Sequence, residues 1–436
     1  MNSNRKLKSR DLYLNKLIAF KDTEPVKIIT GIRRCGKSSL LKLLVEYLKE
    51  NGVEGSQIVE MNFESNDYKN MTSDEVYSFV KEKCYKKRAY LFFDEIQRID
   101  KWEDAINALR VDLDCDIYVT GSNAYLLSSE YATYLSGRCV EIKMLPLSFK
   151  EFIQFNDFEL KKVKSALRGE KNIIIDVNAI QYALSEVFES YLHFGGMPGI
   201  ADVGLEQDKA FALLDGIYST VVVRDILERE KRRGQRQITD SLLLKKIILF
   251  LCDNIGSSVS SSSIGNTLVA EGLLENGSRK GRPSTHTIQA YIEALVEAYF
   301  FYNIKRFDIR GKELLKTLGK YYVVDIGLRN YLLGLRDRDR GHILENIVYL
   351  ELLRRGYDVA IGKLDDMEID FIATNATDKL YVQVTESMIE ETVRKRELTP
   401  LQKVSDNYEK IILTMNDGQV TYDGIKQINL VDWLLA

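Results

Sequence analysis

One eight-residue stretch constrains this chain more than any other. It reads G-x-x-x-x-G-K-[ST] and begins at Gly31. Two glycines at this spacing let the backbone wrap around a phosphate chain with its N–H groups pointing inward. The stretch therefore predicts a binding site for ATP. The residues expected to bind the nucleotide here are Gly31, Ile32, Arg33, Arg34, Cys35, Gly36, Lys37, Ser38 and Ser39.

The residues on either side of the loop support this interpretation. A short apolar strand, residues 26–30, precedes the loop, and residues 39–50 follow with the leucine spacing of a helix. This order places the phosphate at the N-terminus of the helix. Lys37 can reach the β and γ phosphates, and Ser38 can ligate Mg²⁺, which takes few protein ligands. Alternatively, one of the two loop arginines pairs with acids of the core instead of contacting the nucleotide.

A second apolar strand, residues 89–93, ends in Asp94 and Glu95. A buried parallel strand is apolar on both faces, and its C-terminal end can deliver a carboxylate to a bound cation. We therefore predict that Asp94 ligates Mg²⁺ and binds the cofactor, and that Glu95 orients and deprotonates the attacking water. The alternative is a strand that ends in solvated acids.

Further strands at 57–63, 116–123 and 137–144 alternate with helices at 74–87 and 102–110. They predict an α/β fold class: a P-loop, three-layer, doubly wound ATPase core in residues 1–150, with an extra strand between the phosphate loop and the acidic strand. In such a core the ligand lies at the C-terminal edge of the strands. Ser122 or Asn123 would then face the γ phosphate, unless these residues only cap the strand end.

Composition narrows the class of protein. The chain has 436 residues, which suggests roughly three domains. A net charge of −3 neither favours nor excludes nucleic acid. The N-terminus lacks the apolar core of a secretory signal, and no run of about 18 apolar residues predicts a membrane span. The five cysteines and three histidines are scattered, so neither a disulfide framework nor a zinc site is indicated. We expect a cytoplasmic protein that does not bind membranes.

Several stretches together resemble a prokaryotic family of AAA+-related ATPases, in which a C-terminal domain of unknown function follows the ATPase core. They are residues 31–38 (GIRRCGKS), 93–97 (FDEIQ), 120–123 (TGSN), 135–138 (LSGR), 145–149 (LPLSF), 195–198 (GGMP) and 224–226 (RDI). The resemblance covers nearly the whole chain and implies an ATP-binding, ATP-hydrolysing protein. It makes Arg138 a candidate for contacting the γ phosphate, in the same chain or across the interface of a homo-oligomer. A structural salt bridge is the alternative for Arg138.

The middle of the chain is expected to be mostly helical. Residues 151–237 are predicted to form a helical lid or linker, with a basic surface helix and loop at 161–171. His193 is a lone histidine, for which packing or capping is favoured over catalysis. Alternating charges at 228–236 indicate an exposed helix end and a domain boundary.

Residues 238–335 are expected to form a winged helix. The predicted helices are 242–251, 264–269 and 285–298, the last as recognition helix, with wing strands at 300–304 and 321–324. The 279–320 region is basic and predicts a phosphate-contacting patch for double-stranded DNA. Protein contacts or a solvated loop are the alternatives. The basic residues are Arg279, Lys280, Arg282, Lys305, Arg306, Arg310, Lys312, Lys316 and Lys320.

In residues 336–436 the expected order α-β-β-β-α-β resembles the core of PD-(D/E)xK nucleases. The predicted elements are a helix at 341–355, strands at 357–361, 367–373 and 379–384, a helix at 401–408 and a strand at 410–415. The resemblance puts Glu345, Asp370 and Gln383 where metal-binding residues belong. However, Gln383 replaces an acid, and Thr385 replaces the lysine that would stabilise the transition state. A degenerate nuclease-like domain kept for nucleic-acid or protein contact is therefore favoured.

These patterns combine into one main hypothesis. The chain is expected to be a Mg²⁺-dependent ATPase whose nucleotide state controls a C-terminal half that binds nucleic acid or protein. The alternatives are an ATP-gated, metal-dependent nuclease and a nucleotide-switched scaffold that does not hydrolyse ATP. Catalytic roles are expected of Glu95, Lys37, Arg138 and Asn123.

Overall fold

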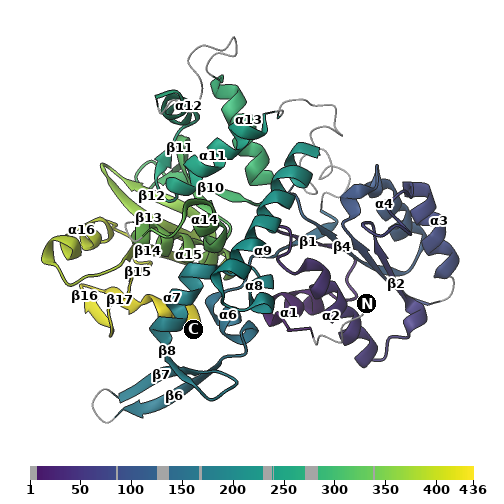
Figure 1. Cartoon of the computed structure of the whole chain (residues 1–436), viewed down its shortest axis with the longest axis horizontal. Coiled ribbons are helices and arrows are strands. Elements are labelled where there is room, and N and C mark those ends of the chain that lie inside the picture. Colours follow the sequence, from purple (N-terminus) through teal and green to yellow (C-terminus); the bar gives the residue numbers. More distant parts are fainter. Residues whose placement is uncertain are drawn as a thin grey trace. The chain divides into compact units, whose positions relative to one another are not determined.

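The computed structural model describes residues 7–84, 87–124, 137–165, 169–228, 238, 240–270, 283–336 and 339–436. The chain divides into two compact units (Figure 1). The first comprises residues 1–146 and 297–299, and the second comprises residues 147–296 and 300–436. Among the helices that the structure describes, none is long and apolar enough to span a membrane.

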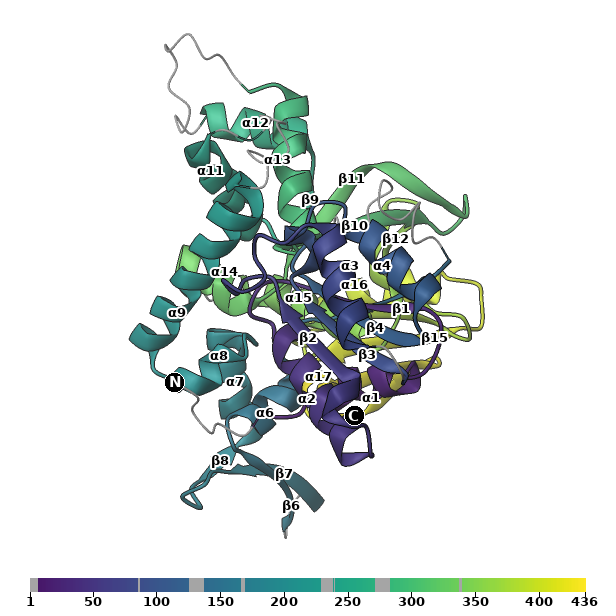
Figure 2. The same cartoon turned by 90° about the vertical axis from the view of Figure 1, so that its right-hand side faces the viewer.

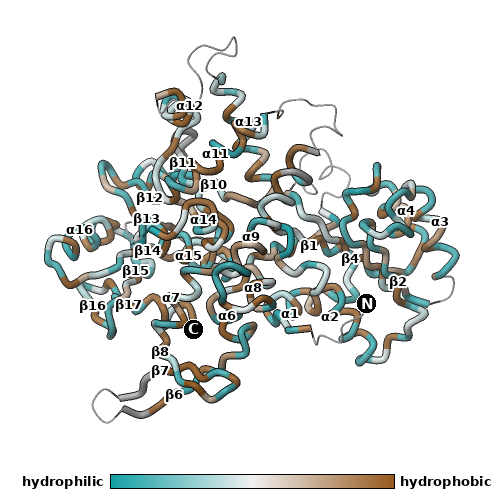
Figure 3. Tube along the Cα trace, in the orientation of Figure 1, coloured by the Kyte–Doolittle hydropathy of each residue, from teal (hydrophilic) through white to brown (hydrophobic). Residues whose placement is uncertain are grey.

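The first unit contains a five-stranded parallel sheet in the order β2-β3-β4-β1-β5. Every residue of β1 and β3 is buried, as expected of parallel strands between two layers of helices. Figure 3 shows the apolar character of β1. The strands are β1 (Val26–Thr30), β2 (Ile58–Asn62), β3 (Ala89–Asp94), β4 (Cys115–Gly121) and β5 (Cys139–Lys143).

Helices cover both faces of this sheet, with α1 and α2 on one face and α3 and α4 on the other (Figure 1). Thr72 and Glu75 form a capping box that starts α3. The prediction of a parallel, three-layer α/β core is confirmed. The helices are α1 (Asp11–Ala19), α2 (Lys37–Glu50), α3 (Ser73–Lys83) and α4 (Trp102–Asp112).

The second unit begins with α6 (Phe149–Phe155) and a small antiparallel sheet of β6, β7 and β8. The strands are β6 (Glu159–Ser165), β7 (Gly169–Ile175) and β8 (Gln181–Ala183). The prediction of a basic helix and loop at 161–171 was therefore wrong. Leu160 pairs across the strands with Ile174, and the β-branched run Ile173–Ile175 favours a strand over a lysine-rich helix.

A group of helices follows the small sheet (Figure 1). The helices predicted at 242–251 and 285–298 are confirmed, and the helix predicted at 264–269 starts earlier, at Ser261. Several residues of the expected DNA-binding patch, Arg279, Lys280 and Arg282, lie outside the described residues. The elements are α7 (Leu184–Phe194), α8 (Gly199–Val203), α9 (Gln207–Thr220), the π-helical η4 (Val221–Glu228), α11 (Ser241–Asp253), α12 (Ser261–Ala270), α13 (Thr285–Glu297) and α14 (Ile326–Leu333).

A mixed nine-stranded sheet lies beside these helices in the order β16-β17-β15-β14-β13-β12-β10-β11-β9 (Figure 2). The hairpin expected as the wing, β10–β11, pairs in parallel with β12, so one sheet crosses the expected boundary between residues 335 and 336. The strands are β9 (Ser258–Val259), β10 (Phe301–Asp308), β11 (Glu313–Val323), β12 (Asp358–Leu364), β13 (Met367–Thr374), β14 (Lys379–Thr385), β15 (Glu409–Thr414), β16 (Val420–Tyr422) and β17 (Ile425–Asn429).

Three helices accompany the C-terminal strands: α15 (Arg340–Arg354), α16 (Glu391–Gln402) and α17 (Leu430–Leu435). The expected element order from α15 to β15 is present, but the helix predicted at 401–408 was wrong. The helix α16 instead ends at Gln402. The first two turns of this helix consist mostly of charged residues, and its buried leucines, Leu398 and Leu401, lie near its C-terminal end. The helix therefore has no apolar stripe along its whole length.

Candidate functional site

The predicted phosphate loop connects the C-terminal end of β1 to α2. Gly31 has a φ of +141°, and a Cβ atom there would lie 2.2 Å from the carbonyl oxygen of Met144. Gly36 has a φ of +106° and caps α2. Both backbone conformations favour glycine, and the first position has no room for any side chain. The two glycines of the motif are therefore required by the local structure.

The lysine of the motif folds back onto its own loop. Its ammonium donates hydrogen bonds to the carbonyl oxygens of Gly31 at 2.8 Å and Ile32 at 3.0 Å. Lys37 is buried, whereas the neighbouring Ser38 is exposed. The Ser38 hydroxyl lies close enough to Asp94 to lower the pKa of that carboxyl. The start of α2 and the end of β3 thus lie close together at the edge of the sheet where parallel strands end.

The Asp94 carboxylate is buried at this edge and is held by neighbouring polar side chains. It accepts hydrogen bonds from Asn62 at 2.8 Å and Thr120 at 2.5 Å. Burial raises the pKa of Asp94 above its usual value, although the hydroxyls of Thr120 and Ser38 oppose the shift. A cation beside this carboxylate would compensate for the hydration that it has lost.

Sequence reasoning assigned no role to Asn62 and Thr120. The signal that could have found them is their place at strand ends, because Asn62 is the last residue of β2 and lies in register with Asp94. Thr120 lies near the end of β4. In a parallel sheet such residues meet at one edge.

The Glu95 carboxylate is held in a defined orientation. One of its oxygens accepts hydrogen bonds from Gln97 at 2.6 Å and Ser122 at 3.2 Å. Its backbone N–H donates to the Thr120 hydroxyl at 3.0 Å. Glu95 adopts a φ of +57°, a left-handed conformation that is costly for a residue with a side chain. Ser122, one of the two residues expected to face phosphate, is thus bonded to Glu95, and Asn123 is buried beside it.

The two loop arginines differ in their surroundings. Arg33 forms ion pairs with Glu64 at 3.1 Å and with Glu95 at 3.9 Å. Arg34 is exposed and has a φ of +62°. The expectation that one loop arginine pairs with acids of the core is met by Arg33.

Arg138 lies at the opposite end of the sheet from the phosphate loop. Its carbonyl oxygen accepts a hydrogen bond from the N–H of Val26, the first residue of β1, whereas the loop follows Thr30, the last residue. These strand ends are roughly 13 Å apart at 3.3 Å per residue. The structure therefore does not bring Arg138 to the phosphate loop of its own chain.

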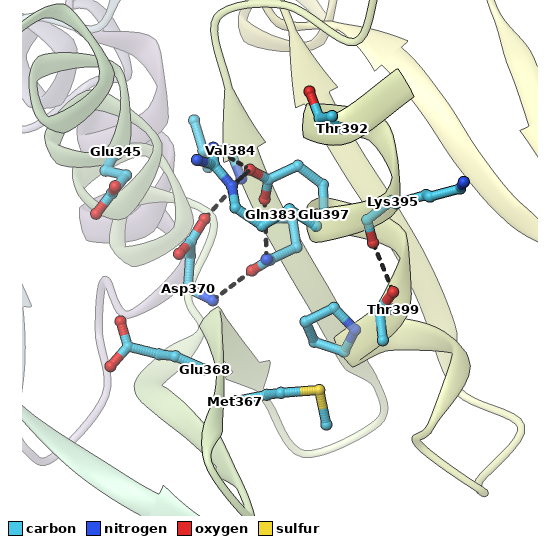
Figure 4. A pocket seen from close by; sticks show the side chains of 12 residues that line it. Glu345, Met367, Glu368, Asp370, Gln383, Val384, Thr392, Lys395, Glu397 and Thr399 are labelled. Carbon is cyan, nitrogen blue, oxygen red and sulfur yellow. Dashed lines mark hydrogen bonds and ion pairs between the residues drawn. The ribbon is translucent and has the colours of Figure 1, made fainter. Parts of the chain in front are cut away.

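The three residues of the expected second metal site line one pocket in the second unit (Figure 4). The pocket has a volume of about 650 Å³. Glu345 comes from α15, Asp370 from β13 and Gln383 from β14. Gln383 accepts a hydrogen bond from the N–H of Asp370 at 2.7 Å and donates one to Glu397 at 3.0 Å, so both ends of its amide are occupied.

The charges around this pocket are partly balanced by a buried lysine. Lys320 lies 2.7 Å from Glu368 and 3.7 Å from Glu345. We expected Lys320 to belong to the DNA-contacting patch. This expectation was wrong, because Lys320 is buried among acidic side chains. Burial raises the pKa of Asp370 well above its usual value. Within the described ranges, no group of three or more His, Cys, Asp or Glu side chains has the arrangement of a metal site.

Two family models match parts of the chain. Residues 23–153 match the model described as an AAA domain. Residues 185–339 match a domain of unknown function (DUF8612). The first match contains both Gly31–Ser38 and the acidic end of β3. It supports the assignment of the first unit to the AAA class.

The chain also resembles solved structures at low identity. A Walker-type ATPase of Pyrococcus abyssi is 15% identical with a TM-score of 0.45, over 76% of this chain and 99% of that one. The Aeropyrum pernix Orc1 protein, solved in complex with DNA, is 12% identical with a TM-score of 0.30, over 75% of this chain and 92% of that one. Similarity at these sequence identities and TM-scores supports no conclusion about bound ligands.

Two relatives match along nearly the whole sequence. An uncharacterized protein of Haemophilus influenzae is 42% identical over 433 residues, which cover 98% of both chains. An uncharacterized protein of Methanocaldococcus jannaschii is 31% identical over 441 residues, which cover 98% of this chain and 88% of the relative. The chain therefore belongs to the same family as these two proteins, and its residues 23–153 match the model of an AAA domain.

Proposed function

We propose that the first unit binds ATP with Mg²⁺ and hydrolyses it. The observation that carries this proposal is the position of the buried Asp94 carboxylate at the C-terminal end of β3, the same edge of the sheet at which the phosphate loop follows β1. A hydroxyl and one carboxylate, completed by water and phosphate oxygens, are a typical ligand set for Mg²⁺. Ser38 and Asp94, the two residues predicted as its ligands, lie close enough for the Ser38 hydroxyl to lower the pKa of Asp94, which supports this assignment.

The surrounding residues fit a nucleotide and its cation. Gly31 and Gly36 both have positive φ angles, and turns with such residues can direct successive N–H groups toward an anion. The raised pKa of the buried Asp94 marks a carboxylate whose charged form lacks compensation. Bound Mg²⁺ would neutralise charge on the phosphate oxygens and help to orient them.

The chain's own residues can then be given roles. Lys37 binds the phosphates after its ammonium leaves the carbonyl oxygens of Gly31 and Ile32. Glu95 holds the attacking water and accepts its proton, with its carboxylate oriented by hydrogen bonds from Gln97 and Ser122. Asn123 contacts phosphate, and Arg138 acts across the interface of a homo-oligomer.

ATP affinity and turnover of the purified protein test this function. Lys37→Ala should abolish ATP binding, and Glu95→Gln should retain binding but lose turnover by about 100-fold or more. Glu103→Gln, which changes another buried glutamate of the same unit, is the matched control. Retained ATP affinity in Lys37→Ala would refute the assignment of the phosphate loop.

For the second unit we propose a nucleic-acid- or protein-binding role controlled by the nucleotide state. Lys305 and Lys312 of the basic region are exposed on the β10–β11 hairpin and its turn. An increase in ATP turnover on adding duplex DNA would support DNA as the partner. A rate of ATP turnover that does not change on adding DNA would favour a protein partner. ATP binding without any turnover would favour a nucleotide-switched scaffold.

An ATP-gated nuclease is the second candidate. The observation that favours it is the single pocket shared by Glu345, Asp370 and Gln383. Against it stand the neutral Gln383, whose amide is already hydrogen-bonded, and Thr385 in place of a lysine. Cleavage of DNA or RNA with Mg²⁺ or Mn²⁺ that Asp370→Ala abolishes would establish this activity.

A further inference from the structure

Arg33 lies within the phosphate loop, yet its guanidinium lies against two carboxylates of the sheet edge. One terminal nitrogen is 3.1 Å from Glu64 and the other is 3.9 Å from Glu95. The side chains of Arg33 and Glu95 are only 12% and 9% exposed. Solvent therefore screens this pair less than it screens an ordinary surface ion pair.

Glu64 is the more exposed carboxylate of this network, with 38% of its side chain accessible to solvent. It lies two residues after the end of β2, and its backbone N–H donates to the Asn62 side chain at 2.8 Å. The oxygen of Glu64 that pairs with Arg33 also pairs with Arg98 at 3.2 Å. Two guanidinium groups thus share one carboxylate, and this arrangement ties Arg33 to the end of β2.

The same guanidinium reaches the carboxylate proposed to activate water. Gln97, Ser122 and Arg33 all approach one oxygen of Glu95. Gln97 and Ser122 follow β3 and β4, whereas Arg33 belongs to the segment that must adapt to a bound phosphate. A shift of the loop would therefore move one of the three groups that orient Glu95 and leave the other two in place.

We propose that Arg33 is a positioning residue that couples the phosphate loop to Glu95, with Glu64 as its anchor. The inference rests on the proposed ATPase function and assigns Arg33 a role through Glu95 instead of a direct contact with phosphate. Arginine suits this role because its planar guanidinium group has two terminal nitrogens that can pair with two carboxylates at once. A lysine at this position would offer a single charge.

The test separates nucleotide binding from turnover. Affinity for a fluorescent ATP analogue is measured in metal-free buffer, and kcat and KM are measured with ATP and Mg²⁺. Arg33→Gln should change the affinity by no more than about threefold, because uniform binding is preserved. The same variant should lower kcat by about tenfold or more, because the water-activating group is misplaced. Arg33→Lys should restore kcat only in part, and Glu64→Gln should lower it in the same direction.

A double variant distinguishes positioning from a general structural effect. In the Glu95→Gln background, adding Arg33→Gln should cause no further loss of turnover, because the group that Arg33 positions is already gone. Arg110→Gln is the matched control, since Arg110 is 11% exposed and pairs with Glu24 at 3.1 Å, away from the loop. Its affinity and kcat should stay within about twofold of the unchanged protein.

Several results would overturn the inference. A large loss of affinity in Arg33→Gln with unchanged kcat would make Arg33 a phosphate ligand, and additive losses in the double variant would make it independent of Glu95. Wild-type kcat in Arg33→Gln would refute this inference alone, provided that Lys37→Ala and Glu95→Gln behave as proposed. Absence of ATP binding or turnover in the unchanged protein would instead refute the proposed function itself.

Discussion

Thr120 donates a hydrogen bond of 2.5 Å to the carboxylate of Asp94. The same hydroxyl accepts a hydrogen bond of 3.0 Å from the backbone N–H of Glu95. A side chain from β4 thus holds both the proposed cation ligand and the backbone of the proposed base. The acidic strand end depends on a neighbouring strand for its geometry.

Replacing Thr120 by Val should therefore weaken the site. The change keeps the shape of the side chain but leaves the buried N–H of Glu95 without its partner, at a cost of about 1–3 kcal/mol in unfolding free energy. Urea denaturation measures this loss. Thr120→Ser, which keeps the hydroxyl, is the control and should retain most of the stability. Equal stability of the Val variant and the unchanged protein would contradict the proposed importance of the hydroxyl.

The buried Asp325 carboxylate should make stability depend on pH. It accepts hydrogen bonds from the N–H groups of Gly196 at 2.6 Å and Leu328 at 3.1 Å. Burial nevertheless raises the pKa of Asp325 to about 6, above the usual 3.8. The folded state therefore binds this proton more tightly than the unfolded state, and the contribution of Asp325 to stability falls as pH rises from about 4 to 6.

Asp325→Asn should remove this part of the pH dependence, which is on the order of 3 kcal/mol. Urea denaturation at several pH values between 4 and 7 checks the slope. Asp308→Asn is a useful comparison, because hydrogen bonding to the N–H of Gly311 lowers the pKa of Asp308. Its contribution is present above the usual pKa and is lost as the solution becomes more acidic, which is the opposite sign. An unchanged slope in Asp325→Asn would refute the assignment.

Gly195 should tolerate no side chain. Its φ is +76°, and a Cβ atom would lie 2.4 Å from the Asp325 carboxylate and 2.5 Å from the N–H nitrogen of Gly327. Gly195→Ala should cost more than about 2 kcal/mol, since strain and collision add. Gly204→Ala is the matched control, because Gly204 has a similar φ of +80° with no atom within 4 Å of the added carbon. It should cost only its backbone strain of about 1–3 kcal/mol, less than Gly195→Ala, and equal losses in the two variants would contradict the collision.

Lys320 should matter for folding more than for nucleic acid. Lys320→Met would remove the ammonium beside Glu368 and the buried Glu345, which would keep His342 and Tyr322 as partners, at a cost of about 1–3 kcal/mol. Lys305→Met changes an exposed lysine of the same hairpin and should leave stability within about 0.5 kcal/mol. Thermal or urea unfolding compares the two variants. Similar stability would show that the acids do not depend on Lys320.

The parts of the fold that could be predicted were those with strong local patterns. The strands β1 and β3 are short apolar runs, and the loop after β1 needs its glycines for backbone reasons alone. The sheet β6–β8 was missed because its apolar residues stabilise it through cross-strand pairs. The predicted position of helix α16 was wrong because the helix is rich in charged residues and lacks a regular spacing of apolar residues.

The sequence by itself determined the chemistry available at the candidate site. Its spacing specified a phosphate loop, a lysine, a hydroxyl and two acids, since each depends on residue type and local backbone. Only the tertiary structure decided which of these groups meet. It joined Thr120 to Asp94, turned Arg33 toward Glu95 and buried Lys320 among acids. These contacts join residues far apart in the chain, and parallel pairing of strands decides which of their ends become neighbours.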